Sequence, residues 1–233
     1  PETAAAEPEK AASEPEQAVV FLGDSITELF PLESHFHDRK TVNRGIGGDR
    51  ITGVGVRLPL SVENLNPSAV FLMIGINDIL FPLYTLDELE RDYTVLLDTI
   101  RHNNPAARLV VQSILPVSGP YEKHNSSVLD LNKRIDGLAA RRNLEYLDLH
   151  STYKNDNGSL RSEYTDDGVH LLPEGYKPWA ETVRSILENE PVKTPGISRL
   201  YQHTQKVIPF LESRTHCAPG TDPGTHEVIQ NHD

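Results

Sequence analysis

Residues 18–25 read Ala-Val-Val-Phe-Leu-Gly-Asp-Ser, a short apolar run that ends in a glycine and two polar side chains. An uninterrupted apolar run of this length, without alternating polar positions, is typical of a strand that is buried on both faces. It predicts the first strand of a parallel sheet. Ser25 then stands where this strand ends and a helix begins.

Four further apolar runs of strand length follow, and segments of helical period separate them. The five expected strands are residues 18–23, 41–44, 69–75, 108–115 and 144–149. Strands that alternate with helices predict a parallel sheet with helices on both faces and right-handed crossovers between strands. Such sheets bind their ligands beyond the carboxyl ends of the strands, so the functional residues are expected there.

Three helices carry clear signals. One begins at Thr85, because Thr85 and Glu88 have the spacing of a capping box. Another opens with Pro173, a residue favoured in the first turn of a helix. The positions expected to face the core are Leu86, Leu89, Tyr93, Leu96, Leu97 and Ile100 in the first helix, Val128, Leu131, Ile135 and Leu138 in a second, and Tyr176, Trp179, Ala180, Val183 and Leu187 in the last.

The chain divides into three expected parts, residues 1–17, 18–190 and 191–233. Thirteen of the first 17 residues are Ala, Glu or Pro, which predicts a flexible leader. Such a leader fits either a spacer after an export signal or anchor, or a terminus without a role. In the last part, apolar positions from Ile197 to Leu211 predict one docked helix, followed by an extended tail.

The composition excludes several classes of function. The chain has 233 residues, with 22 Lys and Arg against 34 Asp and Glu, and a net charge of −12 argues against nucleic acid or an anionic membrane as the main partner. A single cysteine, Cys217, permits neither an intrachain disulfide nor a thiolate metal cluster. No apolar run approaches the roughly 18 residues that span a bilayer. Cytoplasmic and exported locations both stay open, and the leader favours export.

Four segments with candidate functional residues stand at the ends of expected elements: three follow strands and one precedes the last helix. Ser25 follows the first strand, a glycine-rich run at residues 45–49 follows the second, and Asn77 follows the third. Asp167 and His170 stand together before the last helix. A carboxylate three residues before a histidine can orient the imidazole toward a serine. Each segment also has a plain structural explanation, since Ser25 fits an N-cap and the others fit turns.

The four segments together resemble the sequence blocks of the SGNH (GDSL-like) hydrolases. The matching blocks are Gly23-Asp24-Ser25, then Asn43-Arg44-Gly45-Ile46-Gly47-Gly48-Asp49, then Gly75-Ile76-Asn77-Asp78, then Asp167-Gly168-Val169-His170. The Gly-Ile-Gly-Gly-Asp run is similar to the platelet-activating-factor acetylhydrolase-like branch. The first block continues with Ile26 and Thr27, so the literal Gly-Asp-Ser-Leu string is absent. Arg44 stands beside the glycine run and Ile76 within the third block; a role in substrate choice stays open for each, and a structural role is expected.

The resemblance implies a fold and a set of roles. The fold is a three-layer α/β/α sandwich of flavodoxin-like type, with five parallel strands in the order 2-1-3-4-5. Ser25 matches the nucleophile, His170 the general base and Asp167 its orienting carboxylate. The oxyanion hole would consist of the backbone N–H groups of Ser25 and Gly48 and the side chain of Asn77. No metal and no other cofactor is implied.

The expected activity is hydrolysis of short acyl esters, acetyl first, through an acyl-enzyme. The short segments between the blocks leave little material for a lid or a deep acyl tunnel, which favours a small acyl group on a carbohydrate or another polar carrier. Three alternatives stay open: a lysophospholipase, a thioesterase, and a catalytically silent binding module on the same fold. The pairs Asp148 with His150 and His35 with His37, and the histidines from His203 onward, match no block or ligand set and are interpreted as unrelated to the site.

Overall fold

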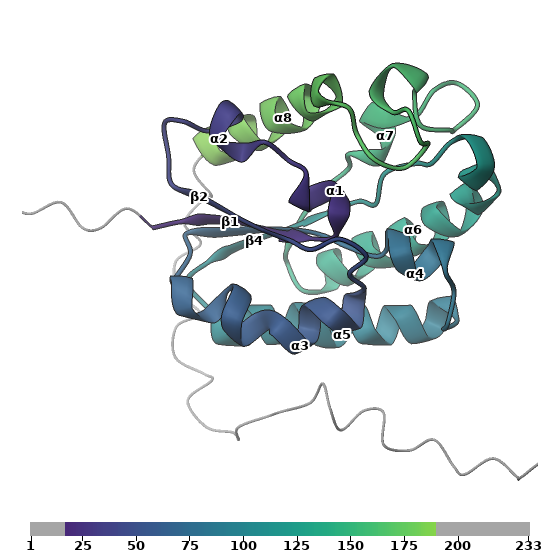
Figure 1. Cartoon of the computed structure of the whole chain (residues 1–233). Helices are drawn as coiled ribbons and strands as arrows, with labels where there is room; N and C mark the ends of the chain where they lie inside the picture. Colours follow the sequence, from purple (N-terminus) through teal and green to yellow (C-terminus); the bar gives the residue numbers. More distant parts are fainter. Residues whose placement is uncertain (1–16, 190–233) are drawn as a thin grey trace, which may run out of the picture.

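One parallel sheet organises the structure, a computed structural model that describes residues 17–189. The sheet has the order β2-β1-β3-β4-β5, as the family resemblance implies (Figure 1). Its strands are β1 (Val19–Gly23), β2 (Thr41–Gly45), β3 (Ala69–Met73), β4 (Arg108–Gln112) and β5 (Glu145–Leu147). The predicted ends of β3 and β4 ran too far, because Ile74 and Ile114 beyond them are also buried although they lie outside the ladder.

Helices cover both faces of the sheet, which gives the expected three layers. In Figure 1, α2, α7 and α8 lie on one side of the sheet, and α3, α5 and α6 lie on the other. The helices are α1 (Ser25–Glu28), α2 (Leu32–His35), α3 (Ile51–Ser61), α4 (Ile76–Leu80), α5 (Leu86–Asn103), α6 (Asn125–Arg141), α7 (His150–Tyr153) and α8 (Tyr176–Glu188). Short 3₁₀ turns span Glu63–Leu65, Gly119–His124, Ser162–Tyr164 and Pro173–Gly175.

The helical patterns read from the sequence are confirmed. Thr85 is the N-cap of α5, and its capping box with Glu88 is complete in both directions. Pro173 opens a 3₁₀ turn that leads directly into α8. All the stripe positions of α6 are buried, whereas Leu86 in α5 and Leu187 in α8 are only partly buried.

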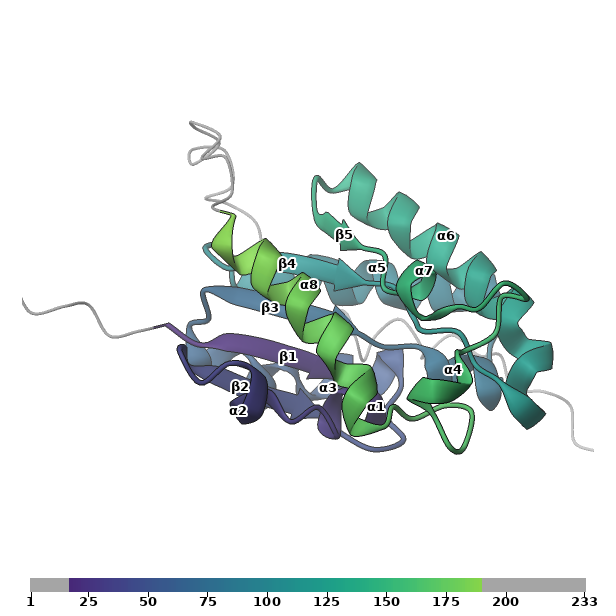
Figure 2. The ribbon, with the colours of Figure 1, turned by 90° about the horizontal axis from the view of Figure 1, so that it is seen from above.

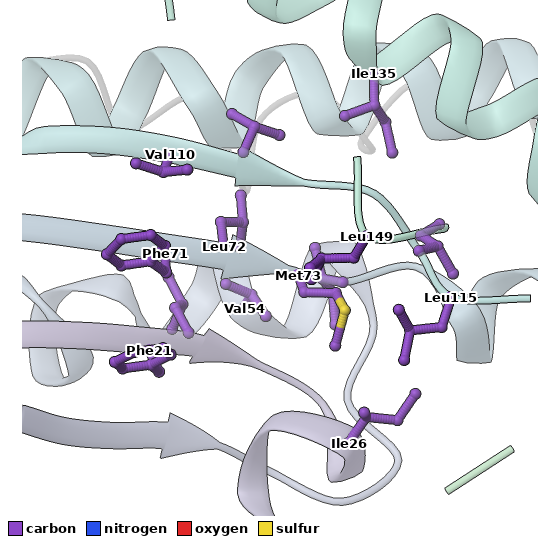
Figure 3. Packing of buried hydrophobic residues seen from close by; sticks show 14 of the residues in the cluster. Phe21, Ile26, Val54, Phe71, Leu72, Met73, Val110, Leu115, Ile135 and Leu149 are labelled. Carbon is purple, nitrogen blue, oxygen red and sulfur yellow. The ribbon is translucent and has the colours of Figure 1, made fainter. Parts of the chain in front are cut away.

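The core lies between the sheet and both helical layers. Phe21, Phe71 and Val110 lie in a row across β1, β3 and β4 (Figure 3), and all three are fully buried. The rings of Phe21 and Phe71 stack with centroids 5.3 Å apart. Figure 2 shows α8 lying over the middle of the sheet. There the indole N–H of Trp179 donates to the Gln112 side chain over 2.6 Å.

The strand register brings the functional segments to one edge. Gly23 at the end of β1 is opposite Gly45 on one side and Met73 on the other. Since these strands are parallel, the residues that follow them emerge side by side. The first three blocks therefore meet at the carboxyl edge of the sheet.

Several sequence-based expectations fall outside residues 17–189. These are the flexible leader and the helix expected between Ile197 and Leu211 with its tail, so they stay predictions. Within the part of the chain that the structure describes, no helix has the length and apolar character needed to span a bilayer.

The capping box of α5 provides a test of the fold that is independent of the site. Thr85→Ala removes the side-chain acceptor for the Glu88 N–H. We expect the free energy of unfolding to fall by about 1 kcal/mol in urea titrations. The matched control is Thr99→Ala, because the Thr99 hydroxyl only donates to the Val95 carbonyl of the same helix. A Thr85→Ala protein as stable as Thr99→Ala would contradict the cap.

Candidate active site

Ser25 is the first residue of α1, but it is not the residue that caps this helix. The N-cap is Asp24, whose carboxylate accepts a hydrogen bond from the Ile26 N–H over 3.0 Å. The N-cap reading of Ser25, open in the sequence, is therefore wrong. Its side chain is left available for chemistry, and the Ser25 Oγ lies 2.8 Å from Nε2 of His170.

The imidazole of His170 lies between Ser25 and Asp167. Its Nδ1 is 2.6 Å from Oδ2 of Asp167, on the opposite side of the ring from the serine. A proton on Nδ1 that is donated to the carboxylate leaves Nε2 as an acceptor for the Ser25 hydroxyl. The structure thus brings together the three residues that the resemblance assigns to one unit, although Ser25 and His170 lie 145 positions apart along the chain.

The Asp167 carboxylate is held in its ionised form. Its partial burial works against the charge, but hydrogen bonds from the His170 ring and from the backbone N–H groups of Val169 and His170 outweigh burial and lower the pKa of Asp167 to about 2. Both backbone donors lie 2.8 Å from Oδ1. Asp167 therefore stays negatively charged, and able to orient the imidazole, through the whole neutral range.

The loop that carries Asp167 and His170 packs against the chain beyond β4. Gly168 has φ +87°, and a Cβ there would lie 2.4 Å from the Ser118 carbonyl oxygen. The Ser118 N–H donates to the Gly168 carbonyl, and the Gly168 N–H donates to the Thr165 hydroxyl, both over 2.9 Å. Only a residue without a side chain permits this approach, so the loop conformation depends on Gly168.

The glycine-rich run forms an exposed turn beside β1. The Ile46 N–H donates to the Gly23 carbonyl, and the Asp49 N–H closes the turn on the Ile46 carbonyl, each over 3.1 Å. Gly48 has φ +74°, with open space where a Cβ would stand. Glycine is therefore favoured at position 48 by the backbone conformation and not by lack of space, because residues with a side chain rarely adopt this φ.

Asn77 joins this turn to the helix that follows β3. Its side-chain Nδ2 donates to the Asp49 carbonyl over 2.9 Å. An amide nitrogen carries two hydrogens, so this bond orients the group and leaves a second donor. The segments that contain Ser25, Gly48 and Asn77 are therefore linked through Gly23 and Asp49 at one edge of the sheet.

The candidate site is open to solvent. The side chains of His170 and Asp167 are 39% and 53% exposed, and Gly47 and Gly48 are exposed as well. Ile46, in the same turn, is 48% exposed. This agrees with the shallow site that the short inter-block segments suggest.

Two side chains that the sequence reasoning did not assign hold α1 in place. Asn43 donates from Nδ2 to the carbonyls of Thr27, Glu28 and Phe30 at the end of α1. The Tyr176 hydroxyl, from α8, donates to the Ile26 carbonyl over 2.9 Å. For Asn43 the only available signal was its place inside the second block. For Tyr176, the sequence predicted only that the side chain faces the core.

The other candidate features have structural roles. The Asp148 carboxylate accepts from the N–H and hydroxyl of Ser151 rather than pairing with His150, which is buried. Arg44 donates to the Ser61 carbonyl at the end of α3, and Ile76 is part of the core. Among residues 17–189, no three His, Cys, Asp or Glu side chains are grouped to hold a metal ion.

Comparison with known proteins decides the family. Residues 21–177 match the model of the GDSL-like lipase/acylhydrolase family. The chain belongs to this family. The family supports ester hydrolysis as the general activity, and the matched range contains all four blocks found in the sequence.

Solved structures of similar proteins agree with the family. A structure named for platelet activating factor, from Streptococcus pneumonia, is 27% identical, with a TM-score of 0.68 over 76% of this chain and 86% of that one. The acetyl xylan esterase AlAXEase is 22% identical, with a TM-score of 0.64 over 73% of this chain and 99% of that one. At this identity, the similarity to AlAXEase shows that the two proteins have the same fold.

A curated relative matches only in part. The N-acylneuraminate cytidylyltransferase of Escherichia coli O18:K1:H7 (strain RS218 / NMEC) is 27% identical over 124 residues, which is 52% of this chain and 26% of that protein. The chain thus spans about a quarter of that relative's length. The name of the whole relative says nothing of what the matched part does.

Asp24 gives the site a measurable dependence of stability on pH. Burial raises the pKa of Asp24 from 3.8 to about 7 in the folded protein. Between these two values the folded state binds one more proton than the unfolded state, so this group's contribution to stability falls as pH rises and is constant above pH 7. Asp24→Asn keeps an acceptor for the Ile26 N–H and removes the titration.

We therefore expect the variant to gain stability relative to the wild type as pH rises. Urea unfolding of both proteins at several values between about pH 4 and pH 8 measures the difference. Asp78, whose pKa burial raises to about 6, is present in both proteins, and its charge also raises the pKa of Asp24, so the comparison measures Asp24 together with its interaction with Asp78. A difference that stays constant across this range would contradict the burial of a titrating Asp24.

Proposed function

We propose that the chain is a serine esterase in which Ser25 is the nucleophile, His170 the general base and Asp167 the orienting carboxylate. The observation that carries this proposal is the hydrogen-bonded line from Ser25 Oγ through the imidazole to Asp167, with distances of 2.8 and 2.6 Å. This is the arrangement that activates a serine hydroxyl for attack on a carbonyl carbon.

Acylation proceeds in two steps. Nε2 of His170 takes the proton of the Ser25 hydroxyl while Oγ bonds to the ester carbonyl carbon and the carbonyl electrons move onto oxygen. The tetrahedral intermediate then expels the alcohol, which receives the proton from His170, and the acyl group remains on Ser25. Water then gives a proton to Nε2 of His170 and attacks the acyl carbon. The second tetrahedral intermediate expels Ser25 Oγ, which takes that proton back from His170, and the acid is released.

The negative charge on the carbonyl oxygen requires donors. The backbone N–H groups of Ser25 and Gly48 and the second amide hydrogen of Asn77 are the proposed three. Their segments meet at the edge of the sheet through the bonds to Gly23 and Asp49. Donors that are already aimed at the developing charge stabilise the transition state more than the ground state.

We propose a short acyl group, with acetyl as the first candidate, on a carbohydrate or a similarly polar carrier. The exposure of His170, Asp167 and the Gly47–Gly48 turn supports this size, because an open edge offers little apolar wall for a long chain. The acetyl xylan esterase with the same fold gives independent support for an acetyl group on a carbohydrate.

The first test concerns the nucleophile and base. Ser25→Ala and His170→Ala should each lower the turnover of p-nitrophenyl acetate by about 10³-fold or more, because serine and base act as one unit. Circular dichroism and melting curves should show both proteins folded. Near-wild-type turnover in either variant would refute the assignment, and an inactive wild-type protein would favour the silent binding module.

The second test concerns the acyl group. We expect kcat/KM on p-nitrophenyl esters not to rise from acetyl toward palmitoyl, since each added methylene gains little binding free energy at an open site. The Ser25→Ala protein measures the background for every ester. A maximum at long chains would replace the acetylesterase proposal with a lysophospholipase, and preference for an acyl thioester would replace it with a thioesterase.

A further inference from the structure

Asp49, directly after the glycine run, uses all its polar groups inside the site. Its N–H donates to the Ile46 carbonyl, and its own carbonyl accepts from Asn77. One carboxylate oxygen accepts from the Arg50 N–H over 2.9 Å. The other accepts from Nε of Arg57 over 2.7 Å. The position of Asp49 therefore determines where both Gly48 and Asn77 lie.

Arg57 connects Asp49 with the end of β1. It projects from α3, and its guanidinium donates in three directions: Nε to Asp49, Nη1 to the Ser61 hydroxyl over 3.0 Å, and Nη2 to the Gly23 carbonyl over 3.0 Å. The side chains of Arg57 and Asp49 are only 15% and 11% exposed. An ion pair sheltered in this way is screened less by solvent than the exposed pairs on the surface.

We propose that Arg57 is the positioning residue of the oxyanion hole. It holds the backbone just before Asp24 and Ser25 through Gly23, and it holds Gly48 and Asn77 through Asp49. The three proposed donors come from three separate segments, and Arg57 is bonded to two of them and reaches the third through the Asp49 carbonyl. This inference rests on the proposed esterase function, because it assigns Arg57 to that same site.

The fork of the guanidinium explains why arginine suits this position. Its donors point in fixed, coplanar directions, so one side chain can bind a carboxylate, a hydroxyl and a carbonyl at once. A lysine ammonium would keep the charge opposite Asp49 but not this directed set of bonds. Misplacement of a catalytic group by about 1 Å can cost about 10²-fold in rate.

The opposite side of Asp49 is packed as tightly. A Cβ at Gly53, one turn along in α3, would lie 1.9 Å from Oδ1 of Asp49. Alanine usually favours a helix over glycine, so Gly53→Ala would stabilise α3 on its own. Here it must push the Asp49 carboxylate aside, which makes it a way of disturbing Asp49 without removing a charge.

The first experiment compares steady-state kinetics of Arg57 variants on p-nitrophenyl acetate. Arg57→Met should lower kcat by about tenfold to a hundredfold with KM little changed, Arg57→Lys should fall between it and the wild type, and Gly53→Ala should also lower kcat. The matched control is Arg108→Met: Arg108 is 17% exposed and also binds a carboxylate, Glu145, and a carbonyl, but at the other end of the sheet.

Arg108→Met should lose stability and keep the wild-type kcat per folded molecule. If Arg57→Met behaves in the same way as Arg108→Met, Arg57 is merely structural and the inference is overturned. Should Arg57→Met fail to fold, Arg57→Lys and Gly53→Ala carry the same comparison, and wild-type kcat in both of them overturns it equally.

The second experiment is a double-mutant cycle with Asn77→Ala, which alone should lower kcat by about 10²–10³-fold. If Arg57 acts through the donors, the double variant should lose at least about fivefold less than the product of the two single losses. Losses that multiply would show independent effects and overturn the inference. An inactive wild-type protein, or a Ser25→Ala protein as active as the wild type, would instead refute the esterase function itself.

Discussion

The parallel register of β1 between β2 and β3 is the constraint on which the site depends. Because Gly23 is opposite both Gly45 and Met73, the chain leaves all three strands at one edge and in one direction. The apolar rows of Phe21 and Phe71 stabilise that register, since a shift by one residue would move each ring to the other face of the sheet. The register alone thus makes neighbours of residues that lie far apart along the chain.

Features of the fold that are local in sequence could be predicted from it. The capping box of Thr85 and Glu88, the apolar stripes of α5 and α6 and the order of the strands follow from residue spacing or from the family resemblance. Strand ends could not be predicted, because burial continues past the ladder: Ile74 and Ile114 are apolar for reasons of packing, not of pairing.

The candidate site divides in the same way. The blocks identified Ser25, Gly48, Asn77, Asp167 and His170, and the structure places Ser25, His170 and Asp167 in one hydrogen-bonded line. The surrounding support was not predictable. Arg57 and Tyr176 contact the site only because α3 and α8 pack against the ends of strands, and a single charged or aromatic residue in a helix carries no signal of such a contact.

The N-cap of α1 was hard to predict for a different reason. Two neighbouring residues, Asp24 and Ser25, both suit that position. From the sequence, only Ser25 was interpreted as a candidate N-cap, but Asp is an equally good one, so residue preference does not distinguish the two. Because the carboxylate of Asp24 accepts the hydrogen bond from the Ile26 N–H, the Ser25 hydroxyl is not needed as the helix cap. That helix end therefore contains a buried acid of raised pKa beside a serine that carries no structural duty.

The bond from the Tyr176 hydroxyl to the Ile26 carbonyl joins positions 150 residues apart and has a consequence for synthesis. A chain made from its N-terminus completes β1 and α1 early, whereas the segment with Asp167, His170 and α8 emerges much later. All five strands precede that segment in the chain, yet a growing chain that lacks it has neither the His170 imidazole nor the helix whose Tyr176 contacts α1. If the proposed mechanism holds, the nascent protein has no esterase activity until the His170 loop and α8 have docked on the sheet.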